Sequence, residues 1–418
     1  MSILRPDRRL KLSLPATGVY ATLSSVSFSA ASSAPTPLYR IYQDTLGLTP
    51  AMVTLIFAIY VLGMLGAFLT FGRLSDHVGR RPMILAALLI NIIALAIFVL
   101  AAHAIDLVIA RLLQGIATGV ALTTLGATIV DAQPRHGATL NGVTAFIGLT
   151  VGSLLSGALI AWAPLPTQLV YEVLLAVTAA EIIFLAVVPE TTQGKTGAWG
   201  ALTPKIAVPT AARPVMTGLL PLNLAGWALG GYYLFLMPSL VSSATSTRSP
   251  FLGASVVAAL MVSATITVLA LRARPTDRLL RLAGAMLAAG IALTLLAVSD
   301  HSAAGMIFGT FVAGVGFGSC YFGSLRALIP LAGERERAGL LAAYLVVSYT
   351  AFAVPAVVAG LLTPRFGLVT TSYVYGAALI VAALASFVIT ALPRRTSPVR
   401  ADVSEAGKGS PSQCAGSG

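Results

Sequence analysis

Long apolar runs separated by short polar segments dominate the hydrophobic pattern of the chain. Each run is about 20 residues long, the length that a helix needs to cross the hydrocarbon core of a bilayer. Polar or Pro-containing breaks such as Arg274-Pro275 and Thr363-Pro364 separate them. Strands of a membrane β-barrel would instead be segments of about 10 residues with alternating hydrophobicity. The pattern predicts twelve transmembrane helices, at residues 14–36, 51–71, 82–102, 106–128, 139–162, 168–189, 214–238, 250–271, 279–299, 303–327, 338–362 and 368–392.

Six of these runs precede a longer polar stretch and six follow it. We expect an N-terminal six-helix bundle (1–189), a cytoplasmic linker (190–213), a C-terminal six-helix bundle (214–392) and a disordered polar tail (393–418) in the cytoplasm. Two similar halves are the layout of a large class of transporters. The expected fold class is an all-α membrane protein with 12 transmembrane helices in two pseudo-symmetric bundles. The first run also resembles a cleavable signal, but it is long enough to span a membrane and eleven runs follow it.

The distribution of basic residues predicts the orientation in the membrane, because Lys and Arg concentrate in cytoplasmic loops. With the N-terminus in the cytoplasm, segments on that side contain 22 of the 26 Lys and Arg residues, and those on the other side contain 3. Both termini are therefore expected in the cytoplasm. The basic composition and the Ala-, Gly- and Leu-rich spans suggest the inner membrane of a bacterium.

Composition narrows the classes of protein further. Of the 418 residues, 57% are hydrophobic and only 10% are charged, whereas a soluble domain has about 25% charged residues. Mean hydropathy is +0.90. These values exclude a soluble enzyme and a disordered protein. The net charge of +12 is no sign of nucleic-acid binding, because the basic residues lie in gaps between apolar runs. Cys320 and Cys414 lie far apart and the four histidines lack ligand spacing, so we expect no metal and no cofactor.

One polar segment between the second and third runs carries a recognisable pattern. It reads Gly72-Arg73-Leu74-Ser75-Asp76-His77-Val78-Gly79-Arg80-Arg81. This segment resembles the signature of the major facilitator superfamily, G-x-L-(small)-D-x-x-G-R-(R/K), in the loop where that family places it. The resemblance implies a twelve-helix secondary transporter that binds a small-molecule substrate in the lipid bilayer, and we expect it to be a monomer.

Two weaker patterns support the same resemblance. In the fourth run, Arg111 and Gln114 fall on the family's R-x-x-Q-G element. The fifth run resembles the element of the 12-span drug/proton antiporter group, with Ser153 in place of its proline. The matching positions in this run are Gly148, Gly152, Ser153 and Gly157.

The resemblance implies a mechanical role for the loop. In the family, the loop's acidic residue reaches the start of span 11 across the interface between the halves. We expect Asp76, Arg73 and Asp131 to form a cytoplasmic latch that helps to hold the outward-open state, with Arg80 and Arg81 beside them. Gly72 and Gly79 would permit the tight turn. The alternative is a solvated loop that only enforces topology.

Three charged side chains lie inside predicted spans and away from the span ends. Arg111 is a functional candidate, because an intramembrane cation is costly; it would bind an anionic group or lower the pKa of a nearby carboxylate. The alternative is that it snorkels to the outer surface. Glu172 and Glu181 are nine residues apart on one helix, so they point to opposite faces and cannot form one site. Glu181 is expected near mid-membrane, either in a structural clamp with Asn91 or as a proton site.

Aromatic and polar residues of the second half are candidates for a substrate cavity. They are Asn223, Trp227, Tyr321 and Tyr344. Aromatic residues near span ends can instead form the interfacial belt.

We therefore expect a secondary active transporter that works by alternating access, with protons as the coupling ion. Efflux of a small lipophilic or aromatic compound is the first interpretation, and uptake of a polar or anionic metabolite is the second. A nucleotide-binding G-x-x-x-x-G-K-[ST] loop is absent from the sequence, so ATP is not expected to drive transport. An intramembrane enzyme or a transporter-derived sensor is a remote alternative, since neither H-E-x-x-H nor G-x-S-x-G occurs.

Overall fold

The computed structural model describes residues 11–391 apart from Gln193, Lys205, Ser246, Arg248, Glu334 and Arg335. The predicted tail at 393–418 lies outside the described residues. Within them, all regular structure is helical. The long helices are α1 (Leu14–Ser33), α3 (Pro50–Phe71), α5 (Arg80–Leu100), α6 (Ala104–Ala132), α7 (Gly137–Trp162), α8 (Leu169–Leu185), α10 (Arg213–Phe235), α12 (Pro250–Leu271), α13 (Thr276–Ser299), α14 (Ala303–Leu328), α15 (Arg337–Phe366) and α16 (Leu368–Ala391). Short helices are α2 (Tyr39–Leu46), α4 (Ser75–Val78), α9 (Ala198–Ala201), α11 (Met237–Thr245) and the 3₁₀ turn η2 (Ile329–Leu331).

The long helices match the twelve predicted runs in order. In the described part of the chain, nine are long and apolar enough to cross a membrane, and the bent pair α10–α11 makes a tenth. The remaining two are α1, which is rich in serine, and α8, which has 17 residues. Helix α1 packs against α6 and α7, and α8 packs against α5, so both belong to the same group of long helices. The all-helical fold class is confirmed.

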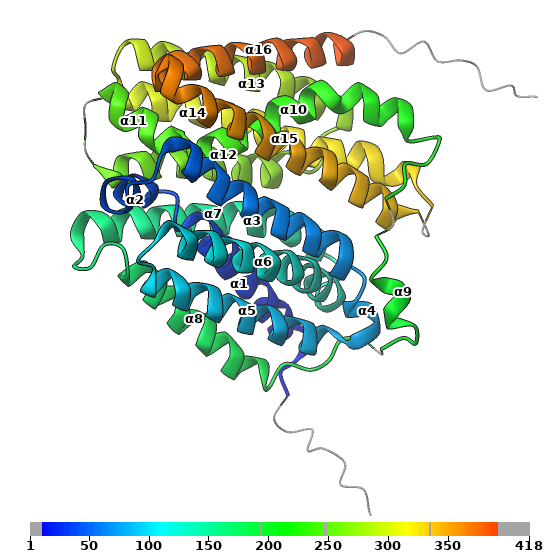
Figure 1. Cartoon of the computed structure of the whole chain (residues 1–418). Coiled ribbons are helices and arrows are strands. Elements are labelled where there is room, and N and C mark those ends of the chain that lie inside the picture. The colour runs from blue at the N-terminus through cyan, green and yellow to red at the C-terminus, as the bar shows by residue number, and fades with distance from the viewer. Residues whose placement is uncertain are drawn as a thin grey trace, which may run out of the picture.

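The helices form two groups that face each other (Figure 1). Helices α1 to α8 pack mainly on one another, and α10 to α16 do the same. The short helix α4 lies at one end of the molecule, and α2 and α11 lie at the other (Figure 1). We call the end that carries residues 72–82 the motif end, and the other the opposite end. The starts of α5, α7, α13 and α15 lie at the motif end.

The seventh span is broken by a sharp bend near its end. Helix α10 ends at Phe235, and α11 continues at an angle of 64°. Pro238 lies in the first turn of α11, where its missing N–H cannot extend the hydrogen-bond ladder of α10. The bend directs α11 across the opposite end, where the Arg40 guanidinium of α2 donates a hydrogen bond to Ser242 Oγ at 3.1 Å.

The two groups of helices touch closely at the opposite end. Helix α7 packs along α12, and α3 packs along α15. Small residues permit both contacts: a Cβ on Gly157 of α7 would lie 2.5 Å from Ala254 Cβ of α12, and a Cβ on Gly360 of α15 would overlap Thr54 of α3. At the motif end the groups leave a cavity between them.

Candidate functional site

A cavity of about 990 Å³ lies between the two groups of helices. Its walls come from α3, α6 and α7 on one side and from α10, α12, α14 and α15 on the other. Most lining side chains are apolar, and many of them are aromatic rings. These rings are Phe68, Phe146, Trp227, Phe317, Tyr321, Phe322, Tyr349 and Phe352. A volume of this size holds a drug-sized molecule.

The cavity extends to the motif end and stops before the opposite end. Near the motif end it is lined by Gly72 and Val130 of the first group and by Ile329 and Pro330 of the second. Val130, Ile329 and Pro330 are exposed, so the cavity opens there. None of its lining residues comes from the α7–α12 contact around Gly157, which closes the opposite end. The molecule is thus open at one end and closed at the other.

Of the four predicted cavity residues, two line the cavity and two lie behind its wall. Trp227 and Tyr321 line it. Tyr344 is buried behind Trp227, whose indole N–H donates to the Tyr344 hydroxyl at 3.4 Å. Asn223 is also buried and exchanges hydrogen bonds with Ser348 of α15. These two residues fix the wall and make no contact with the space inside.

Sequence reasoning missed Phe68, Phe146 and Phe317, whose rings help to join the two halves across the cavity. Phe146 of α7 lies 5.6 Å from Phe317 and 5.4 Å from Tyr321 of α14, between ring centroids. Phe68 of α3 stacks on Tyr349 of α15 at 5.9 Å. The four-residue spacing of Phe317 and Tyr321 puts them on one helix face, which was the one signal available in the sequence.

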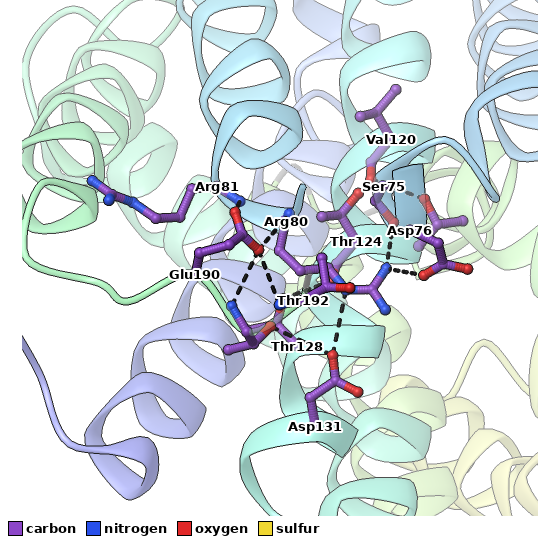
Figure 2. A network of polar contacts seen from close by, with 12 residues as sticks. Ser75, Asp76, Arg80, Arg81, Val120, Thr124, Thr128, Asp131, Glu190 and Thr192 are labelled. Atoms are coloured by element: carbon purple, nitrogen blue, oxygen red, sulfur yellow. Dashed lines mark hydrogen bonds and ion pairs between the residues drawn. The ribbon is translucent and has the colours of Figure 1, made fainter. Parts of the chain in front are cut away.

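A polar network holds the 72–82 segment at the motif end (Figure 2). Arg80 is its centre: Nη1 lies 2.7 Å from Asp76 Oδ1 and 2.5 Å from Ser75 Oγ, and Nε lies 3.4 Å from Asp131 Oδ2 of α6. The Arg80 side chain is only 10% exposed, so these contacts replace its hydration. The network ties α4 and α5 to the end of α6.

Glu190 completes this network and was not predicted. Its carboxylate accepts the backbone N–H groups of Arg80 at 2.8 Å and Arg81 at 3.0 Å, at the start of α5. A carboxylate at this position satisfies free N–H groups and favours the helix dipole. Gly79 precedes these residues with φ +113°, a conformation that a side chain would disfavour. The Arg81 guanidinium donates to the carbonyls of Leu185 and Ala186, at the end of α8.

The sequence matches the Major Facilitator Superfamily over residues 21–354. This match covers most of the chain and includes both walls of the cavity. The chain belongs to this superfamily. It is a multi-pass membrane transporter that binds a small-molecule substrate, and not an enzyme.

Relatives and solved structures of the superfamily resemble the chain in part. The multidrug resistance protein MdtL of Klebsiella pneumoniae subsp. pneumoniae is 36% identical over 115 residues, which are 26% of this chain and 29% of the relative. MdtL of a Shewanella species is 33% identical over 110 residues, 25% of this chain and 28% of the relative. The matched stretches therefore span less than a third of these curated relatives.

Two solved structures share the fold over almost the whole chain. The nucleoside transporter NupG aligns with a TM-score of 0.68 at 11% identity, covering 91% of this chain and 100% of that structure. A D-xylose–proton symporter aligns with a TM-score of 0.69 at 14% identity, covering 88% of this chain and 95% of that structure. At these identities the likeness concerns the fold alone.

The superfamily loop pairs differently from the prediction. Arg80, and not Arg73, contacts Asp131, because Arg80 follows the Gly79 turn onto the side of α5 that faces α6. Asp76 bonds to Arg80 within the first half, and in the described part of the chain nothing from α15 bonds to it. Gly72 fits tightly, since a Cβ there would lie 2.5 Å from the Phe68 carbonyl oxygen.

Arg111 and Gln114 of α6 lie away from the cavity. Both are fully buried against the last turn of α1, at the opposite end of the molecule. The Arg111 guanidinium donates to the Ser32 carbonyl at 2.9 Å, to Gln114 Oε1 at 2.7 Å and to the Tyr39 hydroxyl. Gln114 Nε2 donates to the Ala31 carbonyl at 3.0 Å. Both side chains thus satisfy carbonyls in the last turn of α1, where a cation is also favoured by the helix dipole.

Two of the predicted alternatives for Arg111, snorkelling and pairing with a carboxylate, are not seen among the described residues. The guanidinium is 0% exposed, so it does not snorkel to the surface. Its ion-pair distances to described carboxylates all exceed 4 Å, and instead it lies over the Tyr60 ring, 5.1 Å from the centroid.

The two glutamates of α8 lie in different surroundings. Glu172 is exposed in the first turn. Glu181 lies four residues before the end of α8, nearer the motif end than the predicted mid-membrane depth. Its predicted partner Asn91 donates instead to Thr178 at 3.3 Å. Glu181 Oε2 is enclosed and has no hydrogen-bond partner among the described residues.

The span-5 motif residues of α7 are packing positions. Gly148 and Gly152 let α7 lie against α1, since a Cβ on either would overlap α1 backbone atoms. Gly157 and Ser153 face α12, where Ser153 Oγ donates to the Ala254 carbonyl at 3.3 Å. The serine that replaces the proline of the antiporter element thus contributes to the contact between the halves.

Proposed function

We propose that the protein is a secondary active transporter that works by alternating access and couples efflux of a small lipophilic or aromatic compound to proton entry. The observation that carries the proposal is the cavity of about 990 Å³, lined with aromatic rings from both halves and open at one end only. A cavity between two halves that touch at one end is what alternating access requires. The multidrug resistance proteins to which part of the chain is similar support efflux.

The direction of opening follows from the proposed orientation. The distribution of Lys and Arg puts the motif end in the cytoplasm, together with both termini, in the inner membrane of a bacterium. The structure is then the inward-open state, ready to take up a compound from the cytoplasm or from the inner leaflet.

The latch belongs to the other state in this proposal. When the motif ends of the halves come together, Asp76 is free to accept N–H groups at the start of α15, and its partner Arg80 holds it in place through Asp131. The side chain of Asp76 is 44% exposed here, so it is accessible for that contact.

Glu181 is the proposed proton site. Among the described carboxylates, it alone has an enclosed oxygen without a hydrogen-bond partner, and it lies within the last turns of a long helix. The Tyr20 hydroxyl donates to its backbone carbonyl at 3.0 Å, which fixes α8 against α1. An enclosed carboxyl group that has no cation beside it is costly to ionise. In this proposal, Glu181 takes up and releases a proton when a movement of α1 changes its surroundings.

Flux in inverted membrane vesicles tests the proposal. An acidic lumen should drive a fluorescent aromatic compound into vesicles that contain the protein, and a protonophore should abolish this accumulation. Glu181→Gln should leave binding intact and remove the dependence on the pH gradient; Glu172→Gln, at an exposed position on the same helix, is the control. Gradient-driven loss of the compound from the vesicles would reverse the proposed direction. Unchanged pH dependence in Glu181→Gln would exclude this proton site.

A further inference from the structure

The cavity has two chemically different zones. Its inner zone is aromatic, with Trp227 at its centre: the indole lies 5.1 Å from the Tyr349 ring and 6.2 Å from the Phe352 ring, between centroids. Towards the motif end the lining includes two arginines, Arg73 of the first half and Arg326 of the second. Aspartate and glutamate are absent from the lining formed by described residues, as are lysine and histidine.

Arg326 is held in a fixed position beside the cavity mouth. Its Nη1 donates to the carbonyls of Arg272 and Arg274, each at 2.9 Å, and its guanidinium lies over the Phe322 ring at 5.5 Å. These contacts bind one nitrogen to the turn between α12 and α13. The Nε and Nη2 donors have no hydrogen bond to any described residue, and no described carboxylate pairs with the group.

Arg73 lies on the wall formed by the first half, also near the motif end, and has an unsatisfied N–H donor. Its Nη1 is enclosed by protein and finds no hydrogen-bond partner among the described residues. The acid expected to pair with it, Asp131, is bonded to Arg80. A partly enclosed cation without an acid beside it is unfavourable, and an anion in the cavity next to the Arg73 guanidinium would stabilise its charge. The positive-inside rule accounts for arginines at this end, but it does not require them to line the cavity without acids.

We propose that the cavity selects amphipathic organic anions: compounds with an aromatic body and one carboxylate or similar oxyanion. The aromatic body lies against Trp227, and the anionic group is bound by Arg73 and Arg326, because guanidinium groups match the geometry of carboxylate oxygens. A lipophilic cation of the same shape meets two positive charges and no acidic side chain among the described lining residues. This inference rests on the proposed function, since it names the class of compound that the transporter carries.

Three probes with one aromatic body test the selectivity: 2-naphthoate, its neutral amide 2-naphthamide and the cation 2-naphthylmethylammonium. Binding to the purified full chain is measured through Trp227 fluorescence, with Trp162 and Trp199 replaced by phenylalanine. We expect 2-naphthoate to bind at least about 10-fold more tightly than the cation. Arg326→Gln and Arg73→Gln should each weaken 2-naphthoate binding by about 10-fold and leave 2-naphthamide unchanged within about 2-fold.

Matched variants separate a specific effect from a damaged protein. Arg281→Gln removes an exposed arginine of α13 that does not line the cavity, and it should leave all three affinities unchanged. Arg326→Lys keeps the charge without the planar fork and should retain part of the preference. Sodium sulfate, an anion without an apolar body, should compete only weakly with 2-naphthoate.

The outcomes are decisive in both directions. Equal or tighter binding of the cation would overturn the inference, as would Arg326→Gln and Arg73→Gln variants that weaken all three probes alike. Failure of all three probes to bind would overturn it too. If the anion preference holds but no probe moves in vesicles with a pH gradient, the proposed function fails while the site assignment stands. If probes move in the gradient without a charge preference, the proposed function stands and this inference fails.

Discussion

Replacing Gly157 by alanine is expected to push α7 and α12 apart at the opposite end of the molecule. The added Cβ would lie 2.5 Å from Ala254 Cβ and 3.3 Å from Phe251 Cα. Carbon atoms in contact are about 3.5–4.0 Å apart, so the helices must separate locally by roughly 1 Å. Neither partner is the flexible end of a side chain, so the strain falls on the helix contact itself.

The magnitude follows from the cost of overpacking. Adding one methyl group to a close contact typically costs about 1–3 kcal/mol. If that strain exists only while the opposite end is closed, it shifts the population towards the state that is open there by about 5- to 150-fold. The overall stability changes less, because the alternative state is free of the clash.

Distances between spin labels measure this shift. Labels at Asp44 and Asp300, both exposed at the opposite end, report the separation of the two halves there. Gly157→Ala should add a population at longer distance, and Ala254→Gly in the same protein should remove it. Gly66→Ala is the control, since a Cβ at Gly66 meets no atom within 4 Å. An unchanged distance distribution in a folded Gly157→Ala protein would refute the reasoning.

Substitutions at three further residues test the polar contacts. Glu190→Ala removes the acceptor at the start of α5 and should lower stability by about 1 kcal/mol, measured by thermal unfolding, whereas Glu190→Gln should cost less; equal effects would contradict a carboxylate cap. Arg111→Lys cannot reproduce the forked contacts with Ser32 and Tyr39, so it should lower the free energy of unfolding by about 2–3 kcal/mol in the same measurement. An unchanged melting temperature would argue against the cap on α1. Asp76→Asn should slow transport in vesicles without changing ligand affinity in detergent, and normal rates would exclude the latch.

The fold could be predicted from the sequence because the signal is repeated and local. Each span is a separate apolar run, and the bilayer requires each to be helical, so an error in one boundary does not spread to the next. Boundaries still shifted: α15 continues to Phe366, past the predicted break at Thr363-Pro364. The break occurs at Gly367, which has φ +79°.

The candidate site could be predicted only in part, because partners far apart in sequence leave no periodic signal. The ion pair between Asp76 and Arg80 joins α4 to α5 across the turn at Gly79, so the spacing rule for one helix face does not account for it. Asp131 bonds to Arg80 and not to Arg73, because the turn at Gly79 sets which arginine faces α6. The sequence alone does not determine this backbone conformation. Glu190 lies in the linker, more than 100 residues from the helix start that it satisfies.

The contact between the halves at the opposite end consists of close helix packing and of hydrogen bonds to neutral acceptors, from Arg40 to Ser242 Oγ and from Ser153 to the Ala254 carbonyl. The ion pairs recorded in the described part of the chain all lie within the first half, among Arg80, Asp76, Asp131, His103 and Asp106. Adding salt screens charges but leaves apolar packing intact. The balance between the two faces of this transporter should therefore depend little on ionic strength at that seam and respond instead to the volume of its small residues, because helices within a bilayer associate through close van der Waals packing.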